Sequence, residues 1–172
     1  MGYVKCVKMS SLEQEKTMIT EFQGHYRFLS NFWPINITDG QFLYPSVEHA
    51  YQAHKTNDLG QRKRISHMNS PGMAKRAGRG LVMRDDWNDV KYDIMLGFVR
   101  QKFTGTLGFD LGQKLVATGS QPIIEGNRWH DNYWGSCHCN RHNGDGQNKM
   151  GEILMLIRTE LRGMTINEDV IG

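Results

Sequence analysis

Short alternations of apolar and polar residues open the chain and predict strands. Residues 17–22 (TMITEF) and 25–29 (HYRFL) fit short strands, and residues 122–125 (PIIE) fit another. Residues 35–44 (INITDGQFLY) predict a hairpin, because Asp39 and Gly40 can supply the positive φ of a tight primed turn. The front of the chain is therefore expected to be β-structure.

From Pro45 onward the pattern changes to helical spacing. Pro45 ends strand pairing, and Ser46 can accept the first free amide of a helix that begins near Val47. Ser70 and Pro71 mark a second kind of helix start, with proline at the first helical position. The predicted helices span residues 47–57, 60–68, 71 onward, 87–103 capped by Asp85 or Asp86, 108–118 ending at Gly119, and 147–162 ending at Gly163.

The order of these elements predicts an α+β fold. Apolar residues at helical spacing form a core stripe in two of the helices, namely Val90, Ile94, Phe98 and Val99, and Met150, Ile153, Leu154, Ile157 and Leu161. A small antiparallel β front followed by helices indicates a single helix-rich domain. No linker or repeat interrupts residues 18–162. We expect an N-terminal extension (1–17), one domain (18–163) and a C-terminal tail (164–172).

Composition narrows the class of protein. A chain of 172 residues with 38% hydrophobic residues and a mean hydropathy of −0.57 is ordinary for one soluble domain. No apolar run approaches the roughly 18 residues of a membrane helix, and the first residues do not resemble a secretory signal. Three cysteines, with Cys137 and Cys139 too close in sequence for an easy bridge, favour a reducing, cytoplasmic location.

The charge is modest but uneven. The net charge is +3, yet the segments 61–64 (QRKR) and 74–80 (AKRAGRG) concentrate basic residues within about twenty positions. Such clusters are typical either of a solvated helix face or of a site for a phosphate-rich ligand. The sequence pattern alone leaves both interpretations open.

A helix over 47–57 would bring reactive side chains together. Glu48, Tyr51, Gln52 and Lys55 would share one face, because neighbours on a helix lie three and four positions apart. A glutamate and a lysine at this spacing are also common on ordinary surfaces. The loop 126–146 is a second candidate region, since a connection of about twenty residues inside a domain is usually functional.

Potential metal ligands and aromatic residues fill that loop. Cys137, His138, Cys139 and His142 lie within six residues, but their spacing is a poor match to structural zinc patterns, so we expect no metal and no cofactor. Phosphate-cradling, dinucleotide-binding and serine-nucleophile motifs are missing. The tryptophans of "LSNFWP" and "DNYWG" either anchor the core or stack on a nucleobase.

Several separate blocks resemble one known family. "FLSNFWP", "YPSVEHAYQAHK", "AKRAGR", "RDDW", "VRQKF", "IIEGNRWHDNYWG" and "GQNKMGEILMLIRTELR" occur in the order of the NADAR family, the YbiA-like domains named for NAD and ADP-ribose. The resemblance covers about residues 20–162. It implies a helix-rich α+β fold and an enzyme that hydrolyses N-glycosidic bonds to ribose. The "SCHC" and "RHNGDG" segments depart from some relatives.

The resemblance also implies a set of site residues. Glu48, Lys55 and Asp131 match its catalytic positions. The implied substrate-binding residues are Asn31, Phe32, Trp33, Trp87, Glu125, Trp134 and Gly135, with Arg64, Lys75, Arg76 and Arg79 for phosphates.

Two chemical routes and three functions follow from the resemblance. A carboxylate, Glu48 or Asp131, activates water, or Lys55 forms a Schiff base with the opened sugar. The expected substrate contains ADP-ribose attached to guanine in nucleic acid. We expect the protein to have no membrane association and no obligate protein partner. The alternatives are a phosphorylated ribosylamino-pyrimidine intermediate of riboflavin synthesis and a non-catalytic ADP-ribose or NAD-binding module.

Overall fold

The elements of the computed structural model, which describes residues 18–169, are mostly helices. The α+β, helix-rich fold class is confirmed, while the extension 1–17 lies outside the described residues and the domain boundaries stay predictions. The helices are η1 (Gly24–Leu29), α1 (Val47–Ala53), α2 (Leu59–Ser66), α3 (Pro71–Gly78), α4 (Trp87–Thr104), η2 (Thr106–Gly108), α5 (Phe109–Ala117) and α6 (Lys149–Asp169). The strands are β1 (Ile37–Thr38), β2 (Leu43–Tyr44), β3 (Gly126–Asn127) and β4 (Ser136–Cys137).

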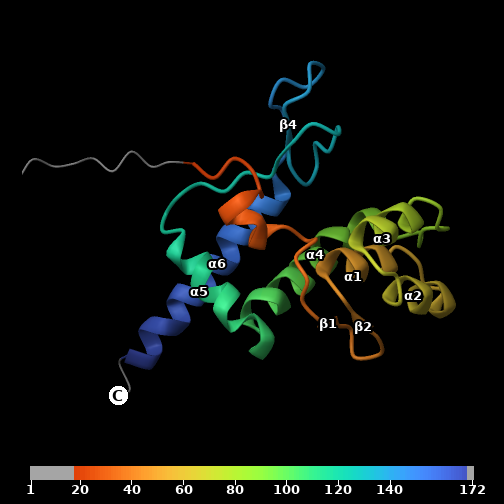
Figure 1. Cartoon of the computed structure of the whole chain (residues 1–172), viewed down its shortest axis with the longest axis horizontal. Helices are drawn as coiled ribbons and strands as arrows, with labels where there is room; N and C mark the ends of the chain where they lie inside the picture. The colour runs from red at the N-terminus through yellow and green to blue at the C-terminus, as the bar shows by residue number, and fades with distance from the viewer. Residues whose placement is uncertain (1–17, 170–172) are drawn as a thin grey trace, which may run out of the picture.

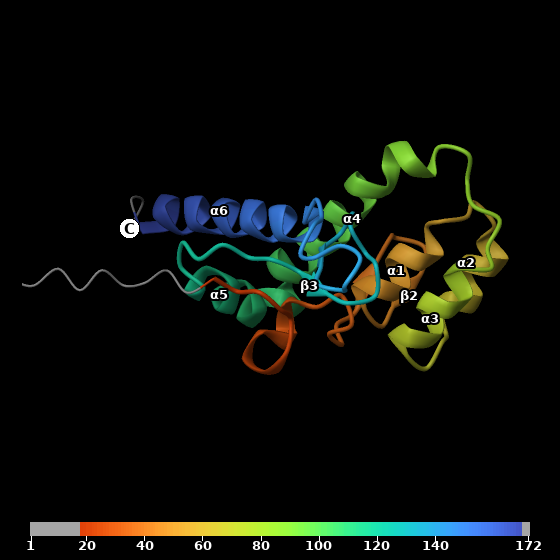
Figure 2. The ribbon, with the colours of Figure 1, turned by 90° about the horizontal axis from the view of Figure 1, so that it is seen from above.

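Helix α4 connects the two ends of the molecule. Helices α1, α2 and α3 gather at one end, α5 and α6 extend toward the other, and α4 contacts α1, α5 and α6 (Figures 1 and 2). In the stripe predicted for α4, Phe98 and Val99 are buried, whereas Val90 and Ile94 are only partly buried against the core. The core therefore runs along α4, and loop 126–146 lies beside it.

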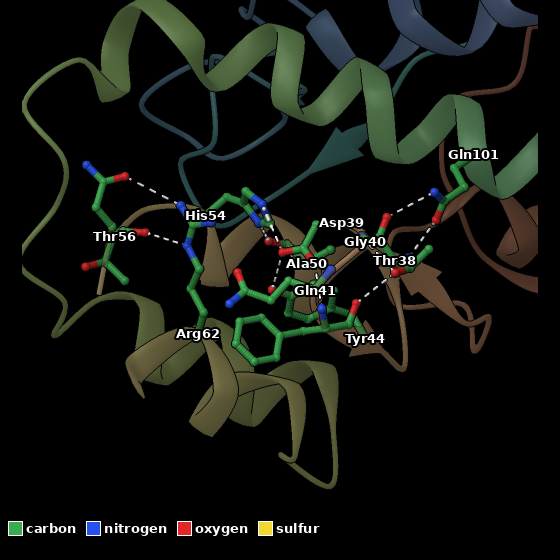
Figure 3. Close-up of polar contacts among 12 residues, drawn as sticks. Thr38, Asp39, Gly40, Gln41, Tyr44, Ala50, His54, Thr56, Arg62 and Gln101 are labelled. Carbon is green, nitrogen blue, oxygen red and sulfur yellow. Dashed lines mark hydrogen bonds and ion pairs between the residues drawn. The ribbon is translucent and has the colours of Figure 1, made fainter. Parts of the chain in front are cut away.

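The predicted hairpin is confirmed, with a different turn. Strands β1 and β2 are antiparallel, but they are joined by four residues, and only Gly40 has a positive φ, of 85°. The Asp39 carboxylate closes the turn by accepting hydrogen bonds from the amides of Gln41 (2.9 Å) and Phe42 (2.7 Å), as shown in Figure 3. Its other oxygen accepts from the Tyr44 hydroxyl at 2.9 Å.

The same turn fastens the hairpin to two helices. Asp39 also lies 3.4 Å from Nε2 of His54, at the end of α1. The Gln101 amide group of α4 accepts from the Thr38 amide at 2.7 Å and donates to the Thr38 carbonyl at 3.0 Å (Figure 3). These bonds hold the hairpin against the end of α1 and against α4, near the place where the candidate site forms.

The other predicted strands are wrong or much shorter than expected. Residues 25–29 belong to the 3-10 helix η1. From residue 18 on, where the structure describes the chain, the segments 17–22 and 122–125 pair at one parallel bridge, between Ile19 and Ile123. Their pairing depends on partners about a hundred residues away, which periodicity alone does not reveal.

Helix starts agree with the sequence better than helix ends do. Ser46 and Ser70 accept hydrogen bonds from the amides three residues on, as predicted, and Gly119, with a φ of 65°, follows the end of α5. Asp86 makes no capping bond, because its carboxylate pairs with Arg84. The predicted end at Gly163 is wrong, since α6 continues to Asp169.

Among residues 18–169, no helix is long and apolar enough to span a bilayer.

Candidate active site

A cavity of about 390 Å³ forms where α1, α4, the segment after η1 and loop 126–146 meet. Its volume is within the range of small-molecule sites. Its lining combines acidic, basic, amide and aromatic side chains. The lining residues are Phe22, Gln23, Ser30, Asn31, Phe32, Glu48, Tyr51, Gln52, Lys55, Lys75, Met95, Glu125, Gly126, Trp129, Asp131 and Trp134.

Glu48 lies in the first turn of α1 and is only 6% exposed. Its amide donates to the Asn31 carbonyl at 3.1 Å, which joins α1 to the segment after η1. Its Oε1 accepts from Nε2 of Gln52 at 2.9 Å. Burial raises the pKa of Glu48, although Gln52 and the charges of Lys75 and Lys55 oppose that shift.

Lys55 lies beyond the end of α1, which is shorter than predicted and stops at Ala53. Lys55 still lines the cavity, because two backbone hydrogen bonds hold it in place. Its amide donates to the Gln52 carbonyl, and its carbonyl accepts from the backbone amide of Arg84 at 2.7 Å. The Lys55 Nζ is 5.7 Å from the ring centroid of Tyr51 and 6.0 Å from that of Trp87. Lys55 is therefore not part of the helix, contrary to the prediction. The side chains of Glu48 and Lys55 nevertheless line the same cavity.

The aromatic surroundings make Lys55 an unusual amine. Burial lowers its pKa, and the positive charges of Lys75 and Arg79 lower it further, while Glu48 and Asp131 act in the opposite direction. A lysine amine with a lowered pKa has more of the neutral, nucleophilic form at a given pH.

Glu125 supplies a second buried carboxyl group to the cavity. Burial raises its pKa to about 7, and the nearby charges of Asp131 and Glu48 act in the same direction. Its Oε2 is buried and has no hydrogen-bond partner among the described residues, and the same is true of Asn31 Oδ1 and Gln52 Oε1. Buried polar atoms are normally paired, so Glu125 Oε2 and Asn31 Oδ1 are suited to contact a bound ligand, whereas Gln52 Oε1 packs against Gly78 of α3.

Asp131 and Trp134 shape the wall formed by the long loop. Asp131 Oδ1 accepts from the amides of Trp134 (2.9 Å) and Tyr133 (3.3 Å), so this carboxylate holds the loop as well as lining the cavity. The Trp134 ring contacts Tyr51 edge to face, with centroids 5.5 Å apart. The carboxyl groups, the Lys55 amine and the Trp134 indole therefore share one pocket.

A cation and two aromatic rings stand at the mouth of the cavity. Lys75 Nζ is 5.8 Å from the Phe32 ring centroid and 5.7 Å from that of Trp129. Trp129 is 59% exposed, and Phe32 is 40% exposed. Exposed rings next to a cation are suited to stacking on a base and to contacting phosphate.

Some predicted site residues do not line this cavity. Trp87 packs behind Lys55, and Trp33 packs against the core. Gly135 has a structural role, because a Cβ there would lie 2.1 Å from the Glu125 carbonyl oxygen. Arg64 and Arg76 line a separate, larger hollow of about 720 Å³ beside α2 and α3, and Arg79 lines neither.

Other lining residues were not singled out from the sequence. Phe22 and Met95 lie in segments whose contacts with α1 are long-range, so no local pattern marks them, and Trp129 was noted only as one of the four tryptophans. Lys102 is fully buried in α4, and its Nζ donates to the Ser30 carbonyl at 2.7 Å. It holds the segment that carries Asn31 and Phe32. Lysine side chains are rarely buried, so burial of Lys102 is not expected from its residue type. In the sequence, only its position within a core helix could have indicated this role.

Comparisons with known proteins agree with the fold and the blocks. The NADAR domain family matches residues 17–162. The chain is 35% identical over 140 residues to "N-glycosidase YbiA" of Escherichia coli K12, covering 79% of this chain and 82% of that protein. The NMR structure of Escherichia coli YbiA superposes with a TM-score of 0.72 at 30% identity, covering 87% of this chain and 88% of that one.

A longer relative matches almost the whole chain. "Riboflavin biosynthesis protein VVA0006" of Vibrio vulnificus is 32% identical over 165 residues, covering 94% of this chain. The chain spans 43% of that protein's length.

Proposed function

Because the chain belongs to the NADAR domain family, we propose that it is an N-glycosidase that hydrolyses the bond between ribose and a base nitrogen. The observation that carries the proposal is the convergence of Glu48, Glu125 and Lys55 on one cavity. Enzymes that cleave glycosidic bonds need a proton donor for the leaving group and a nucleophile for the anomeric carbon. Two buried carboxyl groups and a desolvated amine provide both.

We assign the proton donor to Glu125. Its pKa of about 7 leaves a large fraction of the acid form near neutral pH, as a general acid requires. Its unpaired Oε2 is available to the leaving nitrogen. Glu48 lies on α1, where Gln52 donates a hydrogen bond to its carboxylate. We assign to Glu48 the role of stabilising positive charge at the sugar.

Lys55 is the proposed nucleophile. As the C1–N bond breaks and Glu125 gives its proton to the base, the Lys55 amine bonds to C1. Opening of the sugar ring then gives an imine, which water hydrolyses to free the sugar and the amine. The lowered pKa of Lys55 supports this route over direct attack by water.

Borohydride trapping separates the two routes. With substrate and borohydride present, intact mass and peptide mapping should find a reduced sugar adduct on Lys55. Steady base release with no adduct on any lysine would instead favour water activated by Glu48 or Asp131. Lys55→Met should give no adduct, and Lys63→Met is its matched control, because Lys63 is exposed on α2 and does not line the cavity.

The proposed substrate is ADP-ribose attached to guanine in nucleic acid. The exposed rings of Phe32 and Trp129, with Lys75 between them, are suited to a base and a phosphate outside the reaction centre. The hollow lined by Arg64 and Arg76, which also contains Asp58 and Asp85, offers a further surface for a phosphate backbone.

The second candidate substrate is a phosphorylated ribosylamino-pyrimidine of riboflavin synthesis. The name of the Vibrio vulnificus relative, a riboflavin biosynthesis protein, favours it. Incubation of the protein with guanine-ADP-ribosylated DNA, with the pyrimidine riboside phosphate and with NAD, followed by chromatography of released base, decides between them. Release from the DNA alone supports the first proposal, release from the pyrimidine alone supports the second, and binding without release from any of the three indicates a non-catalytic module.

A further inference from the structure

The long loop brings four potential metal ligands together outside the cavity. They are the side chains of His130, Cys137, Cys139 and His142, whose ligand atoms all lie within 4.8 Å of one another. Both cysteines are free thiols. None of the four lines the 390 Å³ cavity, so the active site does not account for them.

The spacing of these atoms fits a tetrahedral ion. Cys139 Sγ lies 3.3 Å from His130 Nδ1 and 3.2 Å from His142 Nδ1, and the two Nδ1 atoms are 3.4 Å apart. Around zinc, with Zn–N of about 2.0 Å and Zn–S of about 2.3 Å, the edges of a regular tetrahedron are roughly 3.3–3.8 Å. Three of the six edges are thus already near the length that zinc requires.

The backbone explains why these particular residues meet. Cys137 in β4 and Cys139 lie two positions apart in an extended segment, so they share one face and His138 points to the other. A tight turn then returns the chain, with the amides of His142 (3.1 Å) and Asn143 (2.9 Å) donating to the Cys139 carbonyl. His142 is thereby brought back over the thiols.

His130 completes the set from a distant part of the loop. Its φ of 68° is in the left-handed region, which costs a residue other than glycine about 1–3 kcal/mol unless other contacts hold it there. That conformation directs the imidazole at Cys139 and His142. The expectation of no metal rested on the spacing of Cys137, His138, Cys139 and His142, which did not include His130.

We propose that His130, Cys137, Cys139 and His142 form a structural zinc site. Two thiolates and two imidazoles in tetrahedral array are the ligand set that zinc prefers, and all four positions are supplied by protein, as in structural sites. The ion would join the β4 turn to the segment that also carries Trp129 and Asp131. It would therefore hold the part of the loop that lines the cavity, with Trp129 and Asp131, without contacting substrate.

Metal content tests the site without reference to activity. The full chain is purified without a tag, in reductant and with zinc in the medium, then measured by mass spectrometry for zinc after gel filtration. We expect about one zinc per chain in the wild type and a loss of at least about tenfold in Cys139→Ala, His142→Ala and His130→Ala. His138→Ala is the matched control, because it lies between the cysteines but should keep its zinc. Cys137 is not replaced, since it is fully buried.

Cobalt and trypsin provide second measurements. Co²⁺ titrated into the metal-free chain should give thiolate charge-transfer and tetrahedral visible bands that one equivalent of Zn²⁺ removes. Chelation should speed tryptic cleavage at the exposed Arg128 and Arg141 in the wild type and in His138→Ala, but not further in Cys139→Ala. A wild type that binds neither ion, or a His130→Ala chain that keeps full zinc, would overturn the assignment.

Discussion

Burial in the fold strongly changes the ionisation of the Glu125 carboxyl group. Its pKa is about 7 when folded, against 4.5 as the ordinary value, because burial opposes its charge. A raised folded pKa means that the folded protein binds the proton more tightly than the unfolded chain. Its contribution to stability is therefore full below about pH 4.5 and is lost as the pH rises through about 7.

Glu125→Gln should remove that pH dependence. The glutamine stays neutral, so the unfolding free energy of the wild type relative to the variant should fall by about 3 kcal/mol between pH 4.5 and pH 7.5. Urea unfolding of both chains at several pH values measures the difference. Parallel curves would show that the carboxyl group is already ionised in the folded protein across this range.

The secondary structure elements were predictable where the cause is local. Ser46, Ser70 and Gly119 indicate helix boundaries in the sequence. A capping side chain or a glycine with positive φ affects only the adjacent helical turn, so its effect can be predicted locally. The 3-10 helix over residues 25–29 was not predictable, since its pattern of apolar residues also fits a short strand. The end of α6 was also missed, because Gly163 lies within the helix and does not end it.

The close approach of Gly135 to the Glu125 carbonyl gives a prediction for the loop. A Cβ at this position would meet the Glu125 carbonyl oxygen at 2.1 Å, so Gly135→Ala must push β4 away from the segment before β3. We expect a loss of stability of about 1–3 kcal/mol and reduced turnover, because Glu125 and Trp134 flank this contact.

Gly97→Ala is the matched control for that substitution. Gly97 is exposed within α4, and an added Cβ would meet nothing within 4 Å. It should raise stability by about 0.5–1 kcal/mol, as alanine does in a helix. Thermal unfolding of both variants would contradict the packing account if Gly135→Ala unfolded at the wild-type temperature.

The folded chain joins segments that no local pattern connects. Glu48 and Lys55 were found from spacing and resemblance, yet their meeting with Glu125 and Trp129 depends on the path of loop 126–146 over α1. The metal ligands illustrate the same limit, because His130 is seven residues from Cys137 and reaches it only through a left-handed backbone. Convergence of this kind is set by tertiary packing and is visible only in three dimensions.

The rates at which the Glu48→Gln and Lys55→Met variants release base from the substrate test the proposed active site most directly. Each variant should keep its fold by circular dichroism and lose at least about 100-fold in single-turnover rate, whereas Lys63→Met should match the wild type. Wild-type rates in either folded variant would contradict the assignment of this cavity as the place where the ribose–nitrogen bond is cleaved.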